Sequence, residues 1–408
     1  MSGTYKPRNA EETLDVLRWA LAGETPIEVV GHGSKRAIGR PIQTEATLDM
    51  SGVAGVTLYE PEELVLSARA GTPVAEIEAL VAARGQELAF EPIDYGPLLG
   101  APAGRGTIGG LLATNLSGPR RIAKGAARDH VLGIEAVSGR AEAFKSGGRV
   151  VKNVTGYDLS RGLAGSWGTL AVLTAVTFKV LPRAETSETV LIAGLDETRA
   201  VAAMAAAMGS SGEVSGAAHL PADTVAAVGG ALAAAGRPAT VFRLEGIPVS
   251  IAYRAEILGR ALQGFGRLER LPAAESVSLW QAIRDVRPLW PEAAPETAVW
   301  RVSVAPTAGA AVLARVRAGA PGAGGFLDWQ GGLVWIAVPA AVPEAGAGLV
   351  RGAVRAEGGG HATLIRAGAP VRASVPVFEP QPPALAALSR RLKEQFDPKG
   401  ILDPGRMA

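Results

Sequence analysis

The chain has 408 residues, of which 48% are apolar and 20% are charged, so it is long enough for two or three domains with separate hydrophobic cores. Its formal net charge of +2 is too small to predict a nucleic acid or an anionic membrane as a partner. The absence of cysteine excludes disulfides, iron–sulfur clusters, thiolate zinc sites and cysteine nucleophiles within the chain. No signal peptide and no apolar run of about 18 residues is present, so we expect a cytoplasmic protein.

In the first half of the chain, helix patterns alternate with strand patterns. Asn9 is placed to cap a helix that continues to Leu21, because two glutamates follow it in the first turn and apolar residues recur behind them. Pro73 opens a second helix, and Thr107 caps a short third one that extends to residue 116. Strands are expected at residues 27–30, 56–59, 64–70, 131–137 and 169–181. These elements predict one mixed α+β domain that ends near residue 183.

From residue 186 the pattern restarts as two strand–helix units, which favours an open sheet with helices on one side. Helices are expected at residues 197–208 and 250–263, and an amphipathic one at 383–396. The expected strands are residues 189–193, 239–244, 301–304 and 333–338. Five tryptophans are expected in the core or at an interface of this part, namely Trp280, Trp290, Trp300, Trp329 and Trp335.

Three separate glycine loops are the strongest functional signal. They are the segments GHGSK from Gly31, TIGGLLATNLSG from Thr107 and GSWGTL from Gly165. Glycine permits positive φ angles and lets successive N–H groups point at one anion, and a helix that starts at Thr107 would offer further amides to a phosphate. The first loop is not a dinucleotide fingerprint, because its third glycine is misplaced and no ribose-binding acid follows, and alone it fits a plain turn equally well. Together the loops predict a large phosphate-bearing cofactor.

Basic residues surround the second loop. Between Arg105 and Arg161 there are ten lysines and arginines and four acids, an excess that suits a pyrophosphate or an anionic substrate, although a solvated basic face is the alternative for most of them. A near-match to a nucleotide-hydrolysing P-loop at residues 139–146 lacks the glycine before its lysine, so we reject that function.

The order of these segments resembles the FAD-binding domain of the vanillyl-alcohol-oxidase (PCMH-type) flavoproteins. The segments concerned are VVGHGSKRAIG, GTIGGLLATNLSG, RDHVLGIEAV, KNVTGYDLSR and GSWGTLAVLTAVTFKVLP. More narrowly, GGGHATLIR and the final FDPKGILDPGRM resemble the smaller FAD-binding subunits of bacterial glycolate oxidases. The resemblance implies an α+β fold, with a PCMH-type FAD-binding domain of two α+β subdomains over residues 1–183. An α+β cap domain with an open antiparallel, ferredoxin-like sheet would span 184–380, and a helix and tail at 381–408 would pack back on the FAD domain.

The resemblance also implies which residues hold FAD. Some relatives attach FAD covalently to a histidine of the first loop, but His32 is offset from that position, where Ser34 aligns, so we expect non-covalent FAD. The residues assigned to the cofactor belong to the three loops and are Gly31, His32, Gly33, Ser34, Lys35, Thr107, Ile108, Gly109, Gly110, Thr114, Asn115, Gly118, Gly168, Thr169 and Val172.

The reaction of the family is the oxidation of a 2-hydroxy acid to a 2-oxo acid, with hydride passing to the flavin. His361 is a candidate base or substrate donor, and Arg366 is a candidate clamp for the substrate carboxylate. Tyr157 and Lys152, beside a glycine in KNVTGYD, are further candidates to approach the cofactor. Each of these residues fits an ordinary turn, strand or surface position as well.

Three interpretations remain open. The larger catalytic relatives carry a metal-binding HxGDGNxH motif and a later EHG, and this chain has neither, so we expect no metal site. The favoured interpretation is an FAD-binding subunit that oxidises glycolate to glyoxylate together with a larger flavoprotein subunit and an iron–sulfur subunit, which would hold it at the inner face of the membrane. The alternatives are a self-sufficient FAD-dependent 2-hydroxy acid dehydrogenase and a flavin-free scaffold subunit.

Overall fold

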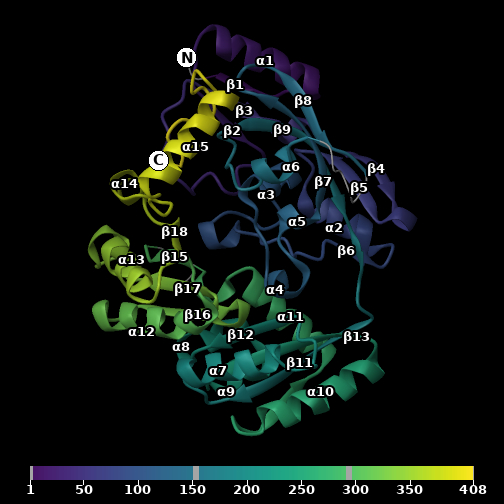
Figure 1. Cartoon of the computed structure of the whole chain (residues 1–408), viewed down its shortest axis with the longest axis vertical. Coiled ribbons are helices and arrows are strands. Elements are labelled where there is room, and N and C mark those ends of the chain that lie inside the picture. The colour runs from purple at the N-terminus through teal and green to yellow at the C-terminus, as the bar shows by residue number, and fades with distance from the viewer. Residues whose placement is uncertain (1–2, 150–155, 291–295, 408) are drawn as a thin grey trace.

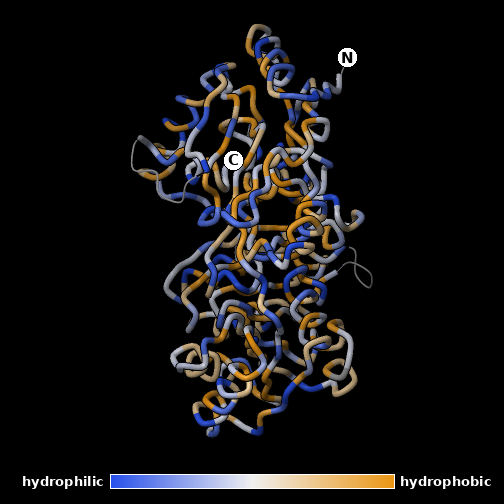
Figure 2. Tube along the Cα trace, turned by 90° about the vertical axis from the view of Figure 1, so that its right-hand side faces the viewer, coloured by the Kyte–Doolittle hydropathy of each residue, from blue (hydrophilic) through white to orange (hydrophobic). Residues whose placement is uncertain are grey.

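Two lobes lie end to end along the long axis of the molecule (Figure 1). The computed structural model describes residues 3–149, 156–290 and 296–407. The first lobe contains the N-terminal half of the chain and the C-terminal helix, and the second lobe contains the segment between them. Apolar segments run through the interior of both lobes and across the level where the lobes meet (Figure 2).

A small parallel sheet begins the first lobe. Its strand order is β1-β3-β2, with bounds Gly3–Tyr5, Ala46–Asp49 and Ile27–Val30. Helix α1 (Ala10–Ala22) packs on it and starts as the sequence predicts, because the Asn9 side chain accepts a hydrogen bond from the Glu12 N–H. The apolar cluster under this sheet also includes Val137 and Val172 from the neighbouring larger sheet.

The larger sheet of the first lobe has five antiparallel strands. In spatial order they are β4 (Val56–Glu60), β5 (Val65–Arg69), β9 (Ala171–Lys179), β7 (Val131–Ser138) and β8 (Ala143–Gly147). The helices of this lobe, apart from α1 and the C-terminal one, are α2 (Val74–Ala82), α3 (Ile108–Thr114), α4 (Arg121–Lys124), α5 (Ala127–His130) and α6 (Leu159–Leu163). Residues of α2 and α3 share one apolar cluster with β5, β7 and β9, so α3 is fixed against the middle of the sheet.

The chain enters the second lobe through a two-stranded crossing, in which β10 (Leu181–Pro182) pairs with β6 (Gln86–Glu87). An eight-stranded sheet with antiparallel neighbours follows, and this confirms the α+β fold with a large open antiparallel sheet. Its spatial order is β14 (Leu268–Leu271), β11 (Thr186–Ala193), β13 (Ala239–Gly246), β12 (Gly216–Leu220), β16 (Gly324–Asp328), β17 (Leu333–Val338), β15 (Ala298–Ser303) and β18 (His361–Arg366).

Helices cover both faces of this sheet, not one face as the strand–helix pattern predicts. The outer face carries α7 (Glu197–Met208), α10 (Pro248–Leu262), α12 (Gly309–Gly319) and α13 (Ala347–Ala356). The other face carries the first lobe together with α8 (Ala222–Val225), α9 (Gly230–Ala235) and α11 (Ala273–Arg284). The reason is that neighbouring strand residues such as Ala217 and Ala218 are both buried, so the sheet is apolar on both faces and each face needs a cover.

The C-terminal segment returns to the first lobe. After α14 (Ala369–Ser374), helix α15 (Pro383–Phe396) runs along the first lobe beside its small sheet, drawn in yellow in Figure 1. The tail beyond it lies against β2, because the Ile27 N–H donates to the Ile401 carbonyl at 2.8 Å and the Asp403 N–H donates to the Ile27 carbonyl at 3.0 Å. This contact brings the tail next to the first glycine loop.

Candidate functional site

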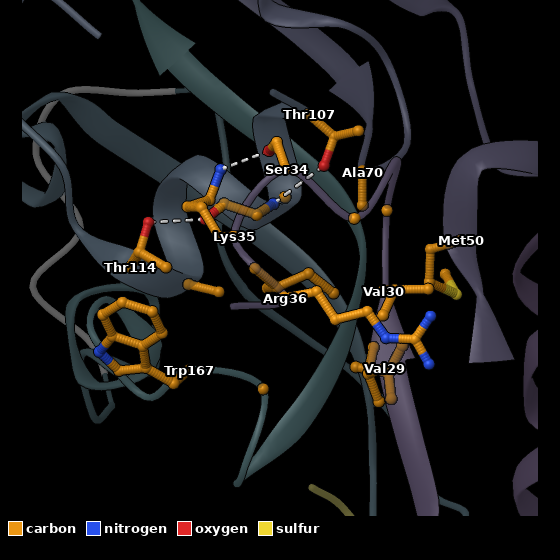
Figure 3. Close-up of a pocket in the computed structure, with 18 of the residues that line it drawn as sticks. Val29, Val30, Ser34, Lys35, Arg36, Met50, Ala70, Thr107, Thr114 and Trp167 are labelled. Carbon is orange, nitrogen blue, oxygen red and sulfur yellow. Dashed lines mark hydrogen bonds between the residues drawn. The ribbon is translucent and has the colours of Figure 1, made fainter. Parts of the chain in front are cut away.

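An open cleft in the first lobe is lined by all three glycine loops (Figure 3). The empty space in and above it, including the part open to solvent, is about 760 Å³. Figure 3 shows Ser34, Lys35, Thr107 and Thr114 around the cleft, with Trp167 at one end. Segments separated by more than 70 residues in the sequence therefore meet around one space.

The backbone N–H groups of the first loop are available to an anion. Within the described part of the chain, the N–H groups of His32, Gly33, Ser34 and Lys35 donate to no protein acceptor. Gly33 has a φ of +74°, a conformation that lets successive amides converge. The Nδ1 atom of His32 is also buried without a hydrogen-bond partner. Because these amides are free of protein acceptors and lie at the cleft, the loop fits a group with several acceptor oxygens, such as a pyrophosphate.

Lys35 adds a positive charge that has no counter-ion in the cleft. Its Nζ lies 3.4 Å from the Ser34 hydroxyl, and burial lowers the Lys35 pKa to about 8 although the Asp94 carboxylate acts in the opposite direction. Among the described residues that line the cleft, Lys35, Arg36 and Arg406 are cationic and none is a carboxylate. The cleft is therefore electrostatically suited to a negatively charged ligand.

FAD affinity is expected to be constant below pH 8 and to fall above it. The protonated Lys35 amine attracts the pyrophosphate, and an amine whose pKa is about 8 in the FAD-free chain loses its proton as the pH rises further. The dissociation constant should then rise by up to about tenfold per pH unit. Titrations followed by flavin fluorescence between pH 7 and 9.5 measure this, and a flat profile would show that Lys35 does not hold the anion.

The second loop has a different role from the one its sequence suggests. The Thr107 Oγ1 accepts a hydrogen bond from the Gly110 N–H at 3.3 Å, as predicted for a cap. However, the Ile108 N–H donates to the Thr72 carbonyl at 2.9 Å and the Gly109 N–H donates to the Ala70 carbonyl at 2.8 Å. These amides are already used within the protein.

The glycines of this region allow close packing. A Cβ atom added to Gly109 would lie 2.7 Å from the Ala70 Cβ, and one added to Gly31 would lie 2.5 Å from the Thr107 Oγ1. Neither distance is compatible with a side chain, so glycine lets α3 and the first loop approach each other. This segment therefore shapes the cleft.

The third loop is held in place by the tail. Gly168 has a φ of +80°, and a Cβ atom there would lie 2.7 Å from an Asp403 carboxylate oxygen. The Lys393 ammonium donates to the Thr169 carbonyl at 2.6 Å and to the Leu402 carbonyl at 3.1 Å. The tail thus fixes the loop that places Trp167 and Val172 in the cleft lining.

Residues 1–147 match the family model of an FAD binding domain. Over 405 residues the chain is 33% identical to the glycolate oxidase subunit GlcE of Escherichia coli (strain K12). The aligned region covers 98% of this chain and 97% of that protein. The chain belongs to the GlcE family of glycolate oxidase subunits. Its first lobe is therefore an FAD-binding domain, and the resemblance stated from the sequence is confirmed.

Two further similarities are more limited in extent or in identity. The chain is 30% identical over 185 residues to the glycolate oxidase subunit GlcD of Bacillus subtilis (strain 168). The aligned region covers 45% of this chain and 38% of that protein. A structure of p-cresol methylhydroxylase with bound substrate superimposes with a TM-score of 0.74 at 13% identity, covering 99% of this chain and 88% of that one. The p-cresol methylhydroxylase structure confirms the fold, and the second lobe is called the cap domain from here on.

Four of the residues assigned to FAD by the sequence lie outside the described cleft lining, namely Ile108, Asn115, Gly118 and Thr169. Asn115 ends α3 with a φ of +49°, and its side-chain oxygen accepts a hydrogen bond from the Arg128 N–H at 3.1 Å. The Gly118 carbonyl accepts a hydrogen bond from the Trp329 Nε1 of the cap domain at 3.0 Å. Both therefore position α3 and the two domains relative to each other.

Arg406 is a cleft residue of this GlcE-family chain that the sequence reasoning missed. It is 6% exposed, and its guanidinium donates to the Asp403 carboxylate at 3.0 Å, the Glu28 carboxylate at 3.2 Å and the Ile38 carbonyl at 3.2 Å. Burial raises the Asp403 pKa to about 6, although Arg406 acts in the opposite direction. Only the tail motif FDPKGILDPGRM could have indicated this arginine.

The three candidate catalytic residues do not form a common site. His361 is exposed at the start of β18, and Tyr157 is 91% exposed. The Arg366 guanidinium donates to the carbonyls of Thr297, Leu289 and Leu98 at 2.9–3.1 Å, so it joins the two domains. None of the three lines the cleft. Lys152 lies outside the described residues.

Across residues 3–149, 156–290 and 296–407, no group of three or more histidine, aspartate or glutamate side chains is arranged to hold a metal ion. Of the helices that the structure describes, none combines the length and apolar character needed to cross a bilayer.

Proposed function

We propose that this chain is the FAD-binding subunit of a glycolate oxidase complex that oxidises glycolate to glyoxylate. The observation that carries the proposal is the cleft of the FAD-binding domain, where four free loop amides and Lys35 face one space. The end-to-end similarity to a glycolate oxidase subunit supports the choice of reaction.

The residues of the cleft divide by chemistry. The amides of residues 32–35, the Ser34 hydroxyl and the Lys35 amine suit the pyrophosphate, whereas Val29, Met50 and Val172 offer an apolar wall to a ring system. When bound, FAD supplies an acceptor for a hydride from the hydroxyl-bearing carbon. Arg406 and Lys393 keep the loops around it in position.

A multi-subunit enzyme is favoured over a self-sufficient dehydrogenase for two reasons. The chain has no cysteine, so an iron–sulfur relay for the electrons would have to be in a partner subunit. His361, Arg366 and Tyr157 are not gathered around the cleft, so a base from a larger flavoprotein subunit fits better. These partners would also hold the chain at the inner face of the membrane.

Spectra of the purified chain, alone and with its partners, test this function. We expect the chain to take up FAD, to keep its flavin oxidised when glycolate is added without oxygen, and to be bleached by glycolate once the partner subunits are present. A chain that takes up no FAD would support the scaffold alternative. Bleaching by glycolate or D-lactate in the isolated chain would support the self-sufficient dehydrogenase.

We expect FAD to be released when the chain is denatured. Hydrogen bonds from loop amides and an ion pair with Lys35 hold a ligand only while the fold persists. The denatured protein should therefore have the 41.7 kDa mass of the polypeptide alone in mass spectrometry, with FAD recovered in the supernatant. A mass increased by one FAD would instead indicate a covalent bond, for which His32 is the nearest candidate.

A further inference from the structure

Two arginines where the domains meet have no partner for their charge among the described residues. Arg121 belongs to α4 of the FAD-binding domain, and Arg301 belongs to β15 of the cap domain. Their guanidinium carbons lie 4.5 Å and 5.0 Å from the centre of the Trp329 ring. Figure 1 shows α4 between α3 and the cap sheet. One tryptophan therefore holds a cation from each domain.

Nearby arginines behave differently. Arg120 and Arg243 each make ion pairs with partly buried glutamates, at 2.6 Å to Glu87 and 2.6 Å to Glu91. By contrast, Arg121 and Arg301 make no ion pair and no side-chain hydrogen bond with any residue that the structure describes, and the Arg301 Nε is buried without a partner. A guanidinium has five N–H donors, so the two arginines can bind a ligand that offers several acceptor atoms.

Two further groups face the arginine pair. The Tyr95 hydroxyl is buried without a hydrogen-bond partner, and burial raises the Tyr95 pKa to about 12 while Arg301 acts in the opposite direction. Tyr95 packs edge-on against Trp335, which is paired with Arg301 across β17 and β15. Asp328 also interacts with Arg301, but burial raises the Asp328 pKa to about 7, so it only partly offsets that cation. A neutral hydroxyl donor and the Arg301 charge therefore act on the same region.

The arginine pair lies close to one end of the FAD cleft. Thr114 lines the cleft, and the chain reaches Gly118 four residues later, where the carbonyl accepts the Trp329 hydrogen bond. Trp167, also in the cleft lining, packs against the apolar cluster that contains Tyr95 and Trp329. A small ligand bound by the arginines would therefore lie at the same domain interface as this end of the cleft.

We infer that Arg121 and Arg301 form a binding site for the carboxylate of the 2-hydroxy acid, shared by the two domains, with Tyr95 as donor to the ligand. The inference rests on the proposed function for the identity of the acid. A carboxylate has two oxygens that can accept from two guanidinium groups, and its negative charge offsets one of the two positive charges. Because one arginine comes from each domain, the ligand also stabilises the domains against separation.

Calorimetric titration and thermal melting with glycolate and glyoxylate test the site. We expect both acids to bind and to raise the melting temperature, and we expect neutral glycolamide to do neither. Arg121→Met and Arg301→Met should each weaken carboxylate binding by about 10- to 100-fold, because each removes a charged hydrogen-bond partner. Arg287→Met is the matched control, since Arg287 lies over Trp290 at 6.0 Å, and it should bind like the wild type.

Other outcomes would overturn the site. Equal binding of chloride, sulfate and glycolate would mean a generic anion site, and unchanged glycolate affinity in both variants would exclude the arginines. The ligand-free variants should melt close to the wild type, because removal of an unpaired charge offsets the lost stacking on Trp329, so a large drop in melting temperature would indicate a structural role. FAD binding is measured separately: glycolate binding without FAD uptake would refute the proposed function and leave the site standing.

Discussion

Replacing Lys35 with methionine is expected to weaken FAD binding by about 10- to 100-fold and to raise the melting temperature of the FAD-free chain. The amine provides a charged hydrogen-bond donor to the pyrophosphate, which typically contributes about 1.5–3 kcal/mol. Without a ligand, the charged amine is desolvated and has no carboxylate partner in the cleft, which destabilises the folded chain. The lowered Lys35 pKa of about 8 reflects this destabilisation. Methionine keeps the chain length and removes the charge. FAD titration and thermal melting of the FAD-free protein measure the two effects.

The Lys35→Met substitution is expected to lower FAD affinity but to raise the melting temperature of the FAD-free chain. A general disruption of the loop would lower both FAD affinity and melting temperature, whereas loss of an unimportant charge would change neither. Lys145→Met is a suitable control, because Lys145 is in the same basic region but exposed on β8 and paired with Glu135. The FAD-free wild type should also gain stability between about pH 8 and 10.5, since its unfolded state holds the Lys35 proton longer, and Lys35→Met should lose this gain.

Arg243→Met is expected to destabilise the protein by about 3–5 kcal/mol, because it removes the closer of the two arginines that pair with the largely buried Glu91 carboxylate. Arg243 and Glu91 are bridged by two hydrogen bonds of 2.6 and 2.9 Å between the cap and the FAD-binding domain, and Arg120 and Glu245 extend the cluster. The Glu91 pKa falls to about 2 under the influence of Arg243 and Arg120, which outweighs the opposing effect of burial. Unfolding by urea measures the loss.

The exposed pair of Arg270 and Glu188 in the same cap sheet provides the comparison. Arg270→Met should cost no more than about 1 kcal/mol, since water screens that pair. The contribution of Glu91 is complete above its unfolded pKa of 4.5 and is lost as the pH falls toward 2, so the difference between wild type and Arg243→Met should shrink below pH 4.5. A difference that stays constant with pH would argue against the ion pair as its cause.

The sequence pattern predicted those elements whose stability is local. The helices at residues 197–208 and 383–396 and the strands at 27–30 and 333–338 are found with the expected bounds. Each carries a periodic apolar pattern that a short window of sequence contains. Fold class followed from the order of such elements and from the family resemblance.

Strands β12 and β16 could not be predicted in this way. Their sequences, GAAHL and GGFLD, contain no β-branched residue, and glycine and alanine have weak strand preferences. They are strands because β13 and β17 provide paired backbones on one side of each. This pairing depends on residues outside the strand itself, so the local sequence pattern does not predict it.

The site was predictable to the extent that it depends on backbone freedom. Glycine loops indicate places where the backbone can approach a ligand closely, and the three loops do meet in one cleft. The sequence did not reveal that the Ile108 and Gly109 amides were already bonded, because their acceptors come from a different strand end. The sequence around single residues such as His361 and Tyr157 does not show which residues surround them in the fold. For the same reason it did not predict that Arg121 and Arg301 lie near one tryptophan.

The tail that lies against β2 has a consequence for biosynthesis. The FAD cleft is completed by Arg406, which contacts Glu28 across 378 positions of sequence. The ribosome therefore synthesises the first part of the cofactor site early and the last part at the end. The surroundings of the loop at residues 31–35 are complete only after the tail has been made. We therefore expect the cofactor to bind fully only after the tail has been synthesised.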